Sequence, residues 1–142
     1  MSKLKKSVSV FLAVLMCFCI MPVTDLGMEA SAYSERTTAP SSDNAYYYNS
    51  SYNPFASSYV GQCTWYAFGR AYEILGYKPN LSTRNGNYWY ADNISKGAFK
   101  YGSTPKVGSI MVTQKTSSSG HVAVVERLNS DGTMMISEYN WI

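Results

Sequence analysis

The sequence predicts a small α+β domain, because two helical stretches precede a series of strands instead of alternating with them. A chain of 142 residues has room for one domain of ordinary size. Residues 63–75 and 87–95 have apolar side chains at helical spacing, whereas residues 108–114, 121–128 and 133–141 have the composition of strands. The strands follow one another along the chain, so we expect an antiparallel sheet.

The first residues have the three parts of a secretory signal peptide. Basic residues occur from Lys3 to Lys6, residues 8–21 are almost wholly apolar, and small residues follow at 30–32. The apolar run is shorter than the roughly 20 residues that a membrane-spanning helix needs. We therefore expect residues 1–32 to be removed and the protein to be secreted without a stable membrane anchor. An uncleaved N-terminal anchor is the alternative.

Residues 33–58 are rich in Ser, Tyr and Asn and show no sustained period, which predicts a linker or a loosely docked arm before a catalytic domain at residues 59–142. The stretch just before the first helix, residues 53–60, contains no carboxylate, so we expect no calcium there. We expect no other metal and no cofactor. The chain carries a net charge of +3, too little for the dense basic patch of a nucleic-acid-binding protein. We expect a monomer.

One cysteine and one histidine remain after the predicted cleavage, because Cys17 and Cys19 lie in the leader. Cys63 stands at the start of the first predicted helix, and His121 opens a predicted strand. The N–H groups of a helix start and a nearby imidazole both favour a thiolate, the reactive form of cysteine. The pair therefore indicates nucleophilic catalysis. A buried, inert thiol and a structural histidine are the alternatives.

The hairpin between the last two predicted strands gives a geometric test of a third partner. A two-residue turn at Asp131-Gly132 would place Glu138 and Asn140 on the same face as His121. A loop with an odd number of residues would place them on the opposite face. In the two-residue register Asn140 lies nearer to His121, whereas a longer even loop brings Glu138 closer, so either residue is a candidate to orient the imidazole.

The chain contains four ordered motifs, which are GQCTWYA at 61–67, VGSI at 107–110, GHVAVVE at 120–126 and ISEYNW at 136–141. Together they resemble one known family over residues 59–142. The match is to the CHAP domains, the cysteine, histidine-dependent amidohydrolase/peptidase family of secreted bacterial peptidoglycan hydrolases, which have a papain-like fold. The chain ends soon after the last motif, so we expect a sheet that is truncated at its C-terminus relative to similar domains.

The resemblance implies a role for each polar candidate. Cys63 would be the nucleophile, His121 the base, Glu138 the acid that orients the histidine, and Asn140 an auxiliary polar residue. Gln62 is a candidate for stabilising the oxyanion, together with the N–H of Cys63.

The same resemblance implies peptidoglycan as the substrate and an acyl-enzyme mechanism at an amide bond. That bond is either N-acetylmuramoyl–L-alanine or one within the stem or cross-bridge peptide. A non-catalytic wall-binding or antigen-like module with the same fold is the main alternative. A thiolate–imidazole metal site is a weaker one, because zinc normally takes three or four ligands. The candidates for lining a substrate groove, each of which would equally suit core packing, are Trp65, Trp89, Tyr90 and Trp141.

Overall fold

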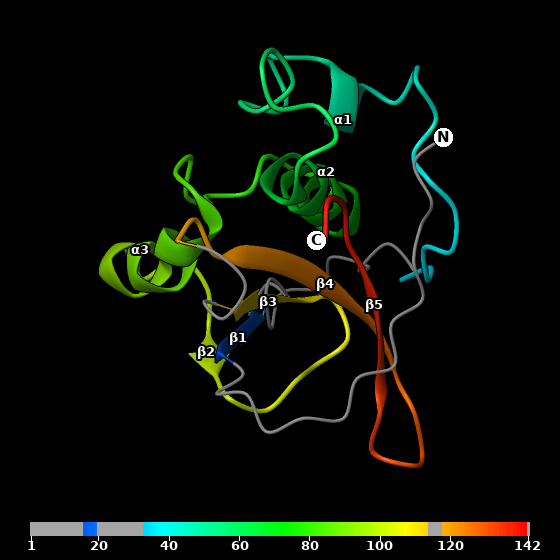
Figure 1. Cartoon of the computed structure of the whole chain (residues 1–142), viewed down its shortest axis with the longest axis vertical. Coiled ribbons are helices and arrows are strands. Elements are labelled where there is room, and N and C mark those ends of the chain that lie inside the picture. The colour runs from blue at the N-terminus through cyan, green and yellow to red at the C-terminus, as the bar shows by residue number, and fades with distance from the viewer. Residues whose placement is uncertain (1–15, 20–32, 114–117, 142) are drawn as a thin grey trace.

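The computed structural model describes residues 16–19, 33–113 and 118–141 (Figure 1). Its sheet is antiparallel with the strand order β2-β1-β3-β4-β5, which confirms the predicted α+β class. The helices are α1 (Ala45–Tyr48), α2 (Cys63–Leu75) and α3 (Trp89–Lys96), and the 3-10 helix η1 (Gly86–Tyr88) leads into α3. The strands are β1 (Met16–Cys19), β2 (Tyr101–Gly102), β3 (Ser109–Thr113), β4 (His121–Leu128) and β5 (Met134–Ser137).

Helix α2 lies across the sheet, and α1 lies on the outer side of α2 (Figure 1). Both bounds of α2 match the helix predicted from the sequence, and Gly76 ends it in the left-handed conformation that favours glycine. Its apolar side chains form the core with those of β3 and β4. The most deeply buried of these core residues are Trp65, Tyr66, Ala67, Ala71, Ile110, Val122 and Val124.

The strand β1 comes from the expected leader. Met16–Cys19 pairs with β2 on one side and with β3 on the other. The rest of residues 1–32 lies outside the described residues, so cleavage of a signal peptide stays a prediction. Within the described ranges, no helix has the length and apolar character needed to cross a bilayer.

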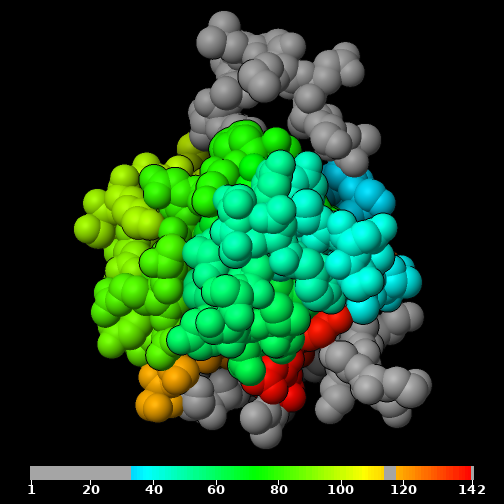
Figure 2. Space-filling view, turned by 90° about the horizontal axis from the view of Figure 1, so that it is seen from above, coloured from blue at the N-terminus to red at the C-terminus, as the bar shows by residue number. Residues whose placement is uncertain are grey.

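Residues 33–58 pack more tightly than the expected linker. Tyr47 is fully buried, and Phe55 lies in the core with it. The buried Asn53 side chain donates hydrogen bonds to the backbone carbonyls of Tyr46 and Trp65, at 3.2 and 3.0 Å. Figure 2 shows this segment, coloured cyan to blue-green, spread over one face of the molecule. The folded domain therefore begins before residue 59, because the arm supplies apolar side chains that cover α2.

The hairpin joining β4 to β5 does not have the predicted two-residue turn. Asn129 and Thr133 are bonded through the backbone at 2.8 Å, so the loop is Ser130–Gly132. The N–H of Gly132 donates to the carbonyl of Asn129, and Gly132 has a positive φ of 83°. A three-residue loop of this kind is a common hairpin connection that needs glycine at its last position. The loop is therefore the odd one of the alternatives that the sequence left open, and Val125 pairs with Ile136.

A β-bulge at Glu126 compensates for the odd loop. Leu128 pairs with Met134 near the loop, but beyond the bulge Val125 pairs with Ile136. The extra residue shifts the register by one position, and this shift exchanges the two faces of one strand relative to the other. His121 and Glu138 consequently share a face, as the sequence predicted, although β5 itself ends at Ser137, earlier than expected.

Candidate active site

Cys63 is the first residue of α2, where the N–H groups of the helix start have no partners within the helix. The half-buried thiol is hydrogen-bonded to the His121 side chain and to the backbone at Thr64 and Val122. Burial raises the pKa of the thiol, but these hydrogen bonds and the charge of His121 lower it by more. The pKa of Cys63 therefore lies below its ordinary value of 9.0, which favours the thiolate.

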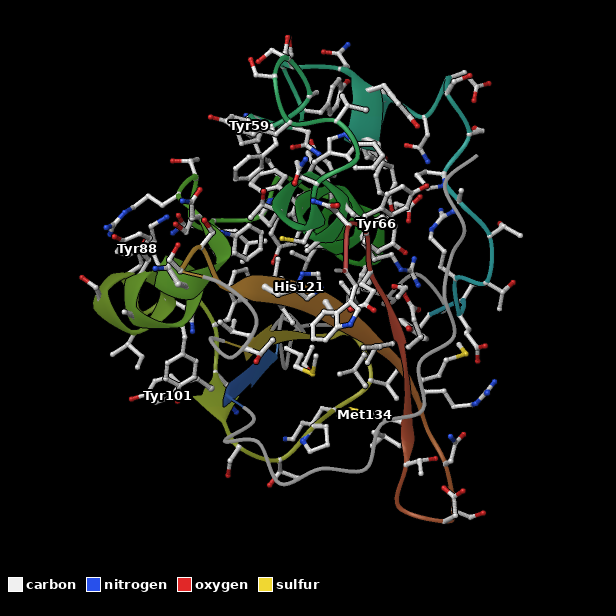
Figure 3. The ribbon with its side chains drawn as sticks, in the orientation of Figure 1. Tyr59, Tyr66, Tyr88, Tyr101, His121 and Met134 are labelled. Atoms are coloured by element: carbon white, nitrogen blue, oxygen red, sulfur yellow. The ribbon has the colours of Figure 1, made fainter. Side chains whose placement is uncertain are left out.

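His121 lies at the start of β4 and beneath α2 (Figure 3). Its side chain is hydrogen-bonded to both Cys63 and Glu138. Its Nε2 is 2.9 Å from Oε2 of Glu138, and both side chains are buried. This contact leaves Nδ1 for the thiol. Burial lowers the pKa of His121, but the hydrogen bonds to Cys63 and Glu138 outweigh burial and raise that pKa to about 9. The three side chains thus favour a thiolate–imidazolium pair next to a carboxylate.

The loop before His121 is held in place by η1. Asn87 donates from its backbone N–H to the carbonyl of Ser119 at 2.9 Å, and from its side chain to the carbonyl of Ser118 at 3.1 Å. Gly120 has a positive φ of 67°, and a Cβ there would lie 2.6 Å from the backbone nitrogen of Asn87. This close contact requires glycine at position 120 and fixes the backbone from which His121 projects.

Glu138, and not Asn140, contacts the imidazole. Asn140 is exposed, and its side-chain nitrogen donates to Oε1 of Gln62 at 2.7 Å. Gln62 immediately precedes α2, so this bond connects the chain after β5 with the start of that helix. Asn140 has a positive φ of 54°, a conformation that asparagine adopts more readily than most residues. The chain turns there, and the Trp141 ring packs edge-on against His121 with 4.7 Å between ring centroids.

A cleft of about 710 Å³ opens over the thiol and the imidazole. Trp141, 40% exposed, lines this cleft as the sequence predicted for a groove residue. Trp65 and Trp89 are only 1% exposed and donate their indole N–H groups to backbone carbonyls. Of the two roles that the sequence left open for them, they therefore take core packing and do not line the cleft. Tyr90 packs against Tyr101 and is not among the lining residues. Two of the four aromatic candidates are therefore core residues.

The sequence reasoning missed several residues of the cleft wall. Tyr59 is 55% exposed and has no motif around it that marks it as functional. Among the described residues that line the cleft, none is Asp, Glu, Lys or Arg. The described part of the chain contains no group of three or more His, Cys, Asp or Glu side chains placed to hold a metal ion. The lining residues that were not singled out are Ser58, Tyr59, Thr64, Asn85, Gly86, Ser119 and Gly120.

The chain was compared with models of known protein families. The family model described as CHAP domain matches residues 47–140, which include the thiol, the imidazole and the carboxylate. The chain belongs to the CHAP domain family. The match also begins at Tyr47, inside the segment that was expected to be a linker, which agrees with the burial of that residue.

Relatives of this CHAP domain include staphylococcal proteins. A Staphylococcus aureus protein named probable autolysin SsaALP is 43% identical over 58% of this chain and 30% of its own length. The N-acetylmuramoyl-L-alanine amidase sle1 of Staphylococcus epidermidis is 40% identical over 67% of this chain and 28% of its own length. The staphylococcal secretory antigen SsaA of Staphylococcus aureus is 37% identical over 74% of this chain and 39% of its own length. The chain thus spans well under half the length of these relatives. No solved structure matches it.

Proposed function

We propose that this CHAP domain is a secreted peptidoglycan hydrolase that cleaves an amide bond of the cell-wall peptide. The observation that carries the proposal is the contact of three side chains at an open cleft, with Cys63 bonded to His121 and His121 bonded to Glu138. Nucleophile, base and orienting group in this order are the arrangement used for acyl transfer. The amidase, autolysin and secretory antigen names of the relatives support the substrate and the secretion.

The proposed reaction starts from the thiolate of Cys63, which attacks the carbonyl carbon of the scissile amide. The carbonyl electrons move to oxygen, and the backbone N–H groups at the start of α2 stabilise this oxyanion. His121 gives its proton to the amide nitrogen as the carbon–nitrogen bond breaks, which releases the amine and leaves a thioester on Cys63. His121 then takes a proton from water, which attacks the thioester and releases the carboxylate product.

In this proposal Glu138 holds the imidazole so that Nδ1 faces the thiol. Gln62 contributes to the oxyanion site through its position beside the helix start, while its side chain accepts a hydrogen bond from Asn140. Asn140 thereby acts as an auxiliary residue that supports the cleft wall. We also propose the papain-like arrangement, in which a helix presents the nucleophile and a strand presents the base.

The side chains of the cleft wall suit a neutral peptide or sugar segment next to the scissile bond. Amide and hydroxyl side chains such as Asn85 and Ser119 offer hydrogen bonds without charge, and Tyr59 and Trp141 offer flat apolar surfaces. Such a mixture suits peptide groups and acetylated sugars better than a strongly charged ligand. Both an N-acetylmuramoyl–L-alanine bond and a stem or cross-bridge peptide bond fit this description.

Replacement of the thiol tests the proposal. Cys63→Ala should abolish the release of muropeptides from purified peptidoglycan, because the proposed acyl-enzyme forms on the sulfur of Cys63. Mass spectrometry of the products of the unchanged protein identifies the bond. Cleavage that frees the amine of L-alanine and cleavage within the stem give fragments of different mass. Ser82→Ala, which removes a buried hydroxyl away from the cleft, is the control and should retain activity.

A non-catalytic module is the alternative, and the same experiment separates the two functions. If Cys63→Ala is folded and solubilises purified wall as well as the unchanged protein does, the enzymatic proposal fails. Binding to wall without any release of products by the unchanged protein would instead support a wall-binding module.

A further inference from the structure

Glu138 holds its place although it lies beyond the end of the sheet. The hydrogen-bonded pairs of β5 stop at Ser137, so no ladder partner fixes the backbone of Glu138. Its carboxylate is nevertheless buried and in contact with His121 at 2.9 Å. The position of this carboxylate must therefore come from contacts made by the residues on either side of it.

On one side, Ser137 is anchored to a buried ion pair. Its hydroxyl donates to Oε1 of Glu126 at 2.6 Å, and the serine is 1% exposed. Arg70 on α2 binds the two carboxylate oxygens of Glu126 with its Nε and a terminal nitrogen, at 2.9 and 2.8 Å. A bidentate pair of this kind fixes both partners in angle as well as distance. The last residue of β5 is thus tied to α2, the helix that also carries Cys63.

On the other side, Tyr139 is held by its ring. It stacks on Tyr66 with 5.0 Å between centroids and meets Trp65 edge-on at 5.2 Å. Ring contacts of this type allow some sliding, whereas a hydrogen bond to a fixed carboxylate restricts direction. Of the two anchors, Ser137 is therefore the one that sets the direction in which the next side chain points.

We propose that Ser137 is a positioning residue for Glu138. Its hydroxyl, fixed on the Arg70–Glu126 pair, holds the end of β5 so that the Glu138 carboxylate meets Nε2 of His121. The inference rests on the proposed function, because the orientation of the imidazole matters for the transfer of a proton from the thiol. Ser137 touches neither the cleft nor the reacting atoms.

Loss of this anchor should alter both the rate and the titration of the thiol. When Glu138 is held less closely, the imidazolium is less stabilised, and the thiolate that it supports is less stabilised in turn. Ser137→Ala should lower kcat about tenfold, well below the roughly 10²-fold loss that a 1 Å misplacement can cause. KM should stay within about twofold, because the wall of the cleft is unchanged. The pH at which Cys63 becomes reactive should rise toward the ordinary value of a thiol.

The experiment measures the alkylation rate of Cys63 against pH by peptide mass spectrometry, and kcat and KM on soluble muropeptides. Ser82→Ala is the matched control, since Ser82 is also buried and donates to a carboxylate, that of Asp92, at 2.6 Å. This control should keep the unchanged titration and rate. Ser137→Thr, which keeps the hydroxyl, should restore most of the activity lost in Ser137→Ala.

Each outcome decides for or against the positioning role. A folded Ser137→Ala variant with the titration and kcat of the unchanged protein would overturn it, and so would equal shifts in Ser137→Ala and Ser82→Ala. If Ser137→Ala does not fold, Ser137→Cys replaces it, with the ring N–H proton resonance of His121 as the readout. An unchanged resonance would then overturn the inference. If the unchanged protein releases no muropeptides, the proposed function fails, while the alkylation titration still decides the role of Ser137.

Discussion

Two buried carboxylates, Glu126 and Glu138, differ in how completely they are bonded. Among the described residues, Glu138 has one hydrogen-bond partner, the imidazole of His121, and it lies beside the cleft. Glu126 lies deeper and is bonded by several donors. These donors are the Arg70 guanidinium, the Tyr33 and Ser137 hydroxyls and the backbone N–H of Arg36.

The difference shows how one fold gives two buried carboxylates different cations as partners. Burial raises the pKa of Glu126, but the bonds to Arg70, Ser137 and Tyr33 lower it by more, so the carboxylate stays ionised. Its partner is a guanidinium that does not give up its proton in proteins. The partner of Glu138 is an imidazole, which does exchange protons near neutral pH. Glu126 and Glu138 are both buried, so they differ mainly in the cation that each contacts.

The largest effect should come from the same isosteric substitution made at the two carboxylates. Glu138→Gln should lower kcat by roughly 10²–10⁴-fold, the range that general acid–base groups contribute, because the neutral amide no longer stabilises the imidazolium. Glu126→Gln should lower kcat far less and should mainly reduce the free energy of unfolding. Initial rates on muropeptides and urea unfolding of both variants test this. Equal rate losses in the two variants would remove the distinction between them.

The next effect is on stability. Arg70→Met should reduce the free energy of unfolding by about 3–5 kcal/mol, because it leaves a buried carboxylate without its cation. Arg84→Met is the matched control, since the Arg84–Asp92 pair is 3.2 Å long and its arginine side chain is 54% exposed. The control should lose less than about 1 kcal/mol. Urea unfolding followed by tryptophan fluorescence measures both, and a similar loss in the two variants would contradict the assigned role of Arg70.

The smallest effect should appear in the pH dependence of the unfolding free energy. The folded-state pKa of His121, about 9, lies above its ordinary value of 6.5, so its contribution is complete below about pH 6.5 and is lost as the pH rises through about 9. The pKa of Glu126 is lowered, so its contribution is present above about pH 4.5 and is lost as the pH falls further. His121→Ala should flatten the alkaline side of the profile and Glu126→Gln the acid side. A variant that flattens the opposite side would refute this assignment.

The sequence was sufficient to predict the local elements of the site. Helix 63–75 and strand 121–128 have the predicted bounds, because their apolar spacing is strong and glycine or polar residues flank them. The grouping of Cys63 with His121 followed from their being the only cysteine and the only histidine outside the expected leader. Roles for these residues in catalysis remain predictions until the variants are measured.

The hairpin register could not be derived from the sequence. Asp131-Gly132 equally permits a two-residue turn and the observed three-residue loop, since both accept glycine at the end of the turn. The bulge at Glu126 gives no local signal in the sequence, yet it shifts the pairing of the residues beyond it. This shift places Glu138 on the same face as His121.

The composition of the sequence also did not predict which aromatic side chains are buried. Tyr47 lies in a Tyr- and Asn-rich stretch that reads as a linker, yet it is fully buried, because its ring packs against Trp65 and Tyr66 of α2. Trp65 and Trp89 have the amphipathic side chains that suit a sugar-binding groove, but their N–H groups find backbone acceptors inside the core. An indole whose N–H donates to a backbone carbonyl can be buried without leaving that donor unpaired.

The odd loop and the bulge together constrain which insertions and deletions the hairpin can tolerate. Removing one residue from Ser130–Gly132 would turn Glu138 to the face away from His121, unless the bulge at Glu126 disappeared at the same time. An exposed loop tip, remote from any substrate, therefore accepts changes of length far less freely than changes of residue type.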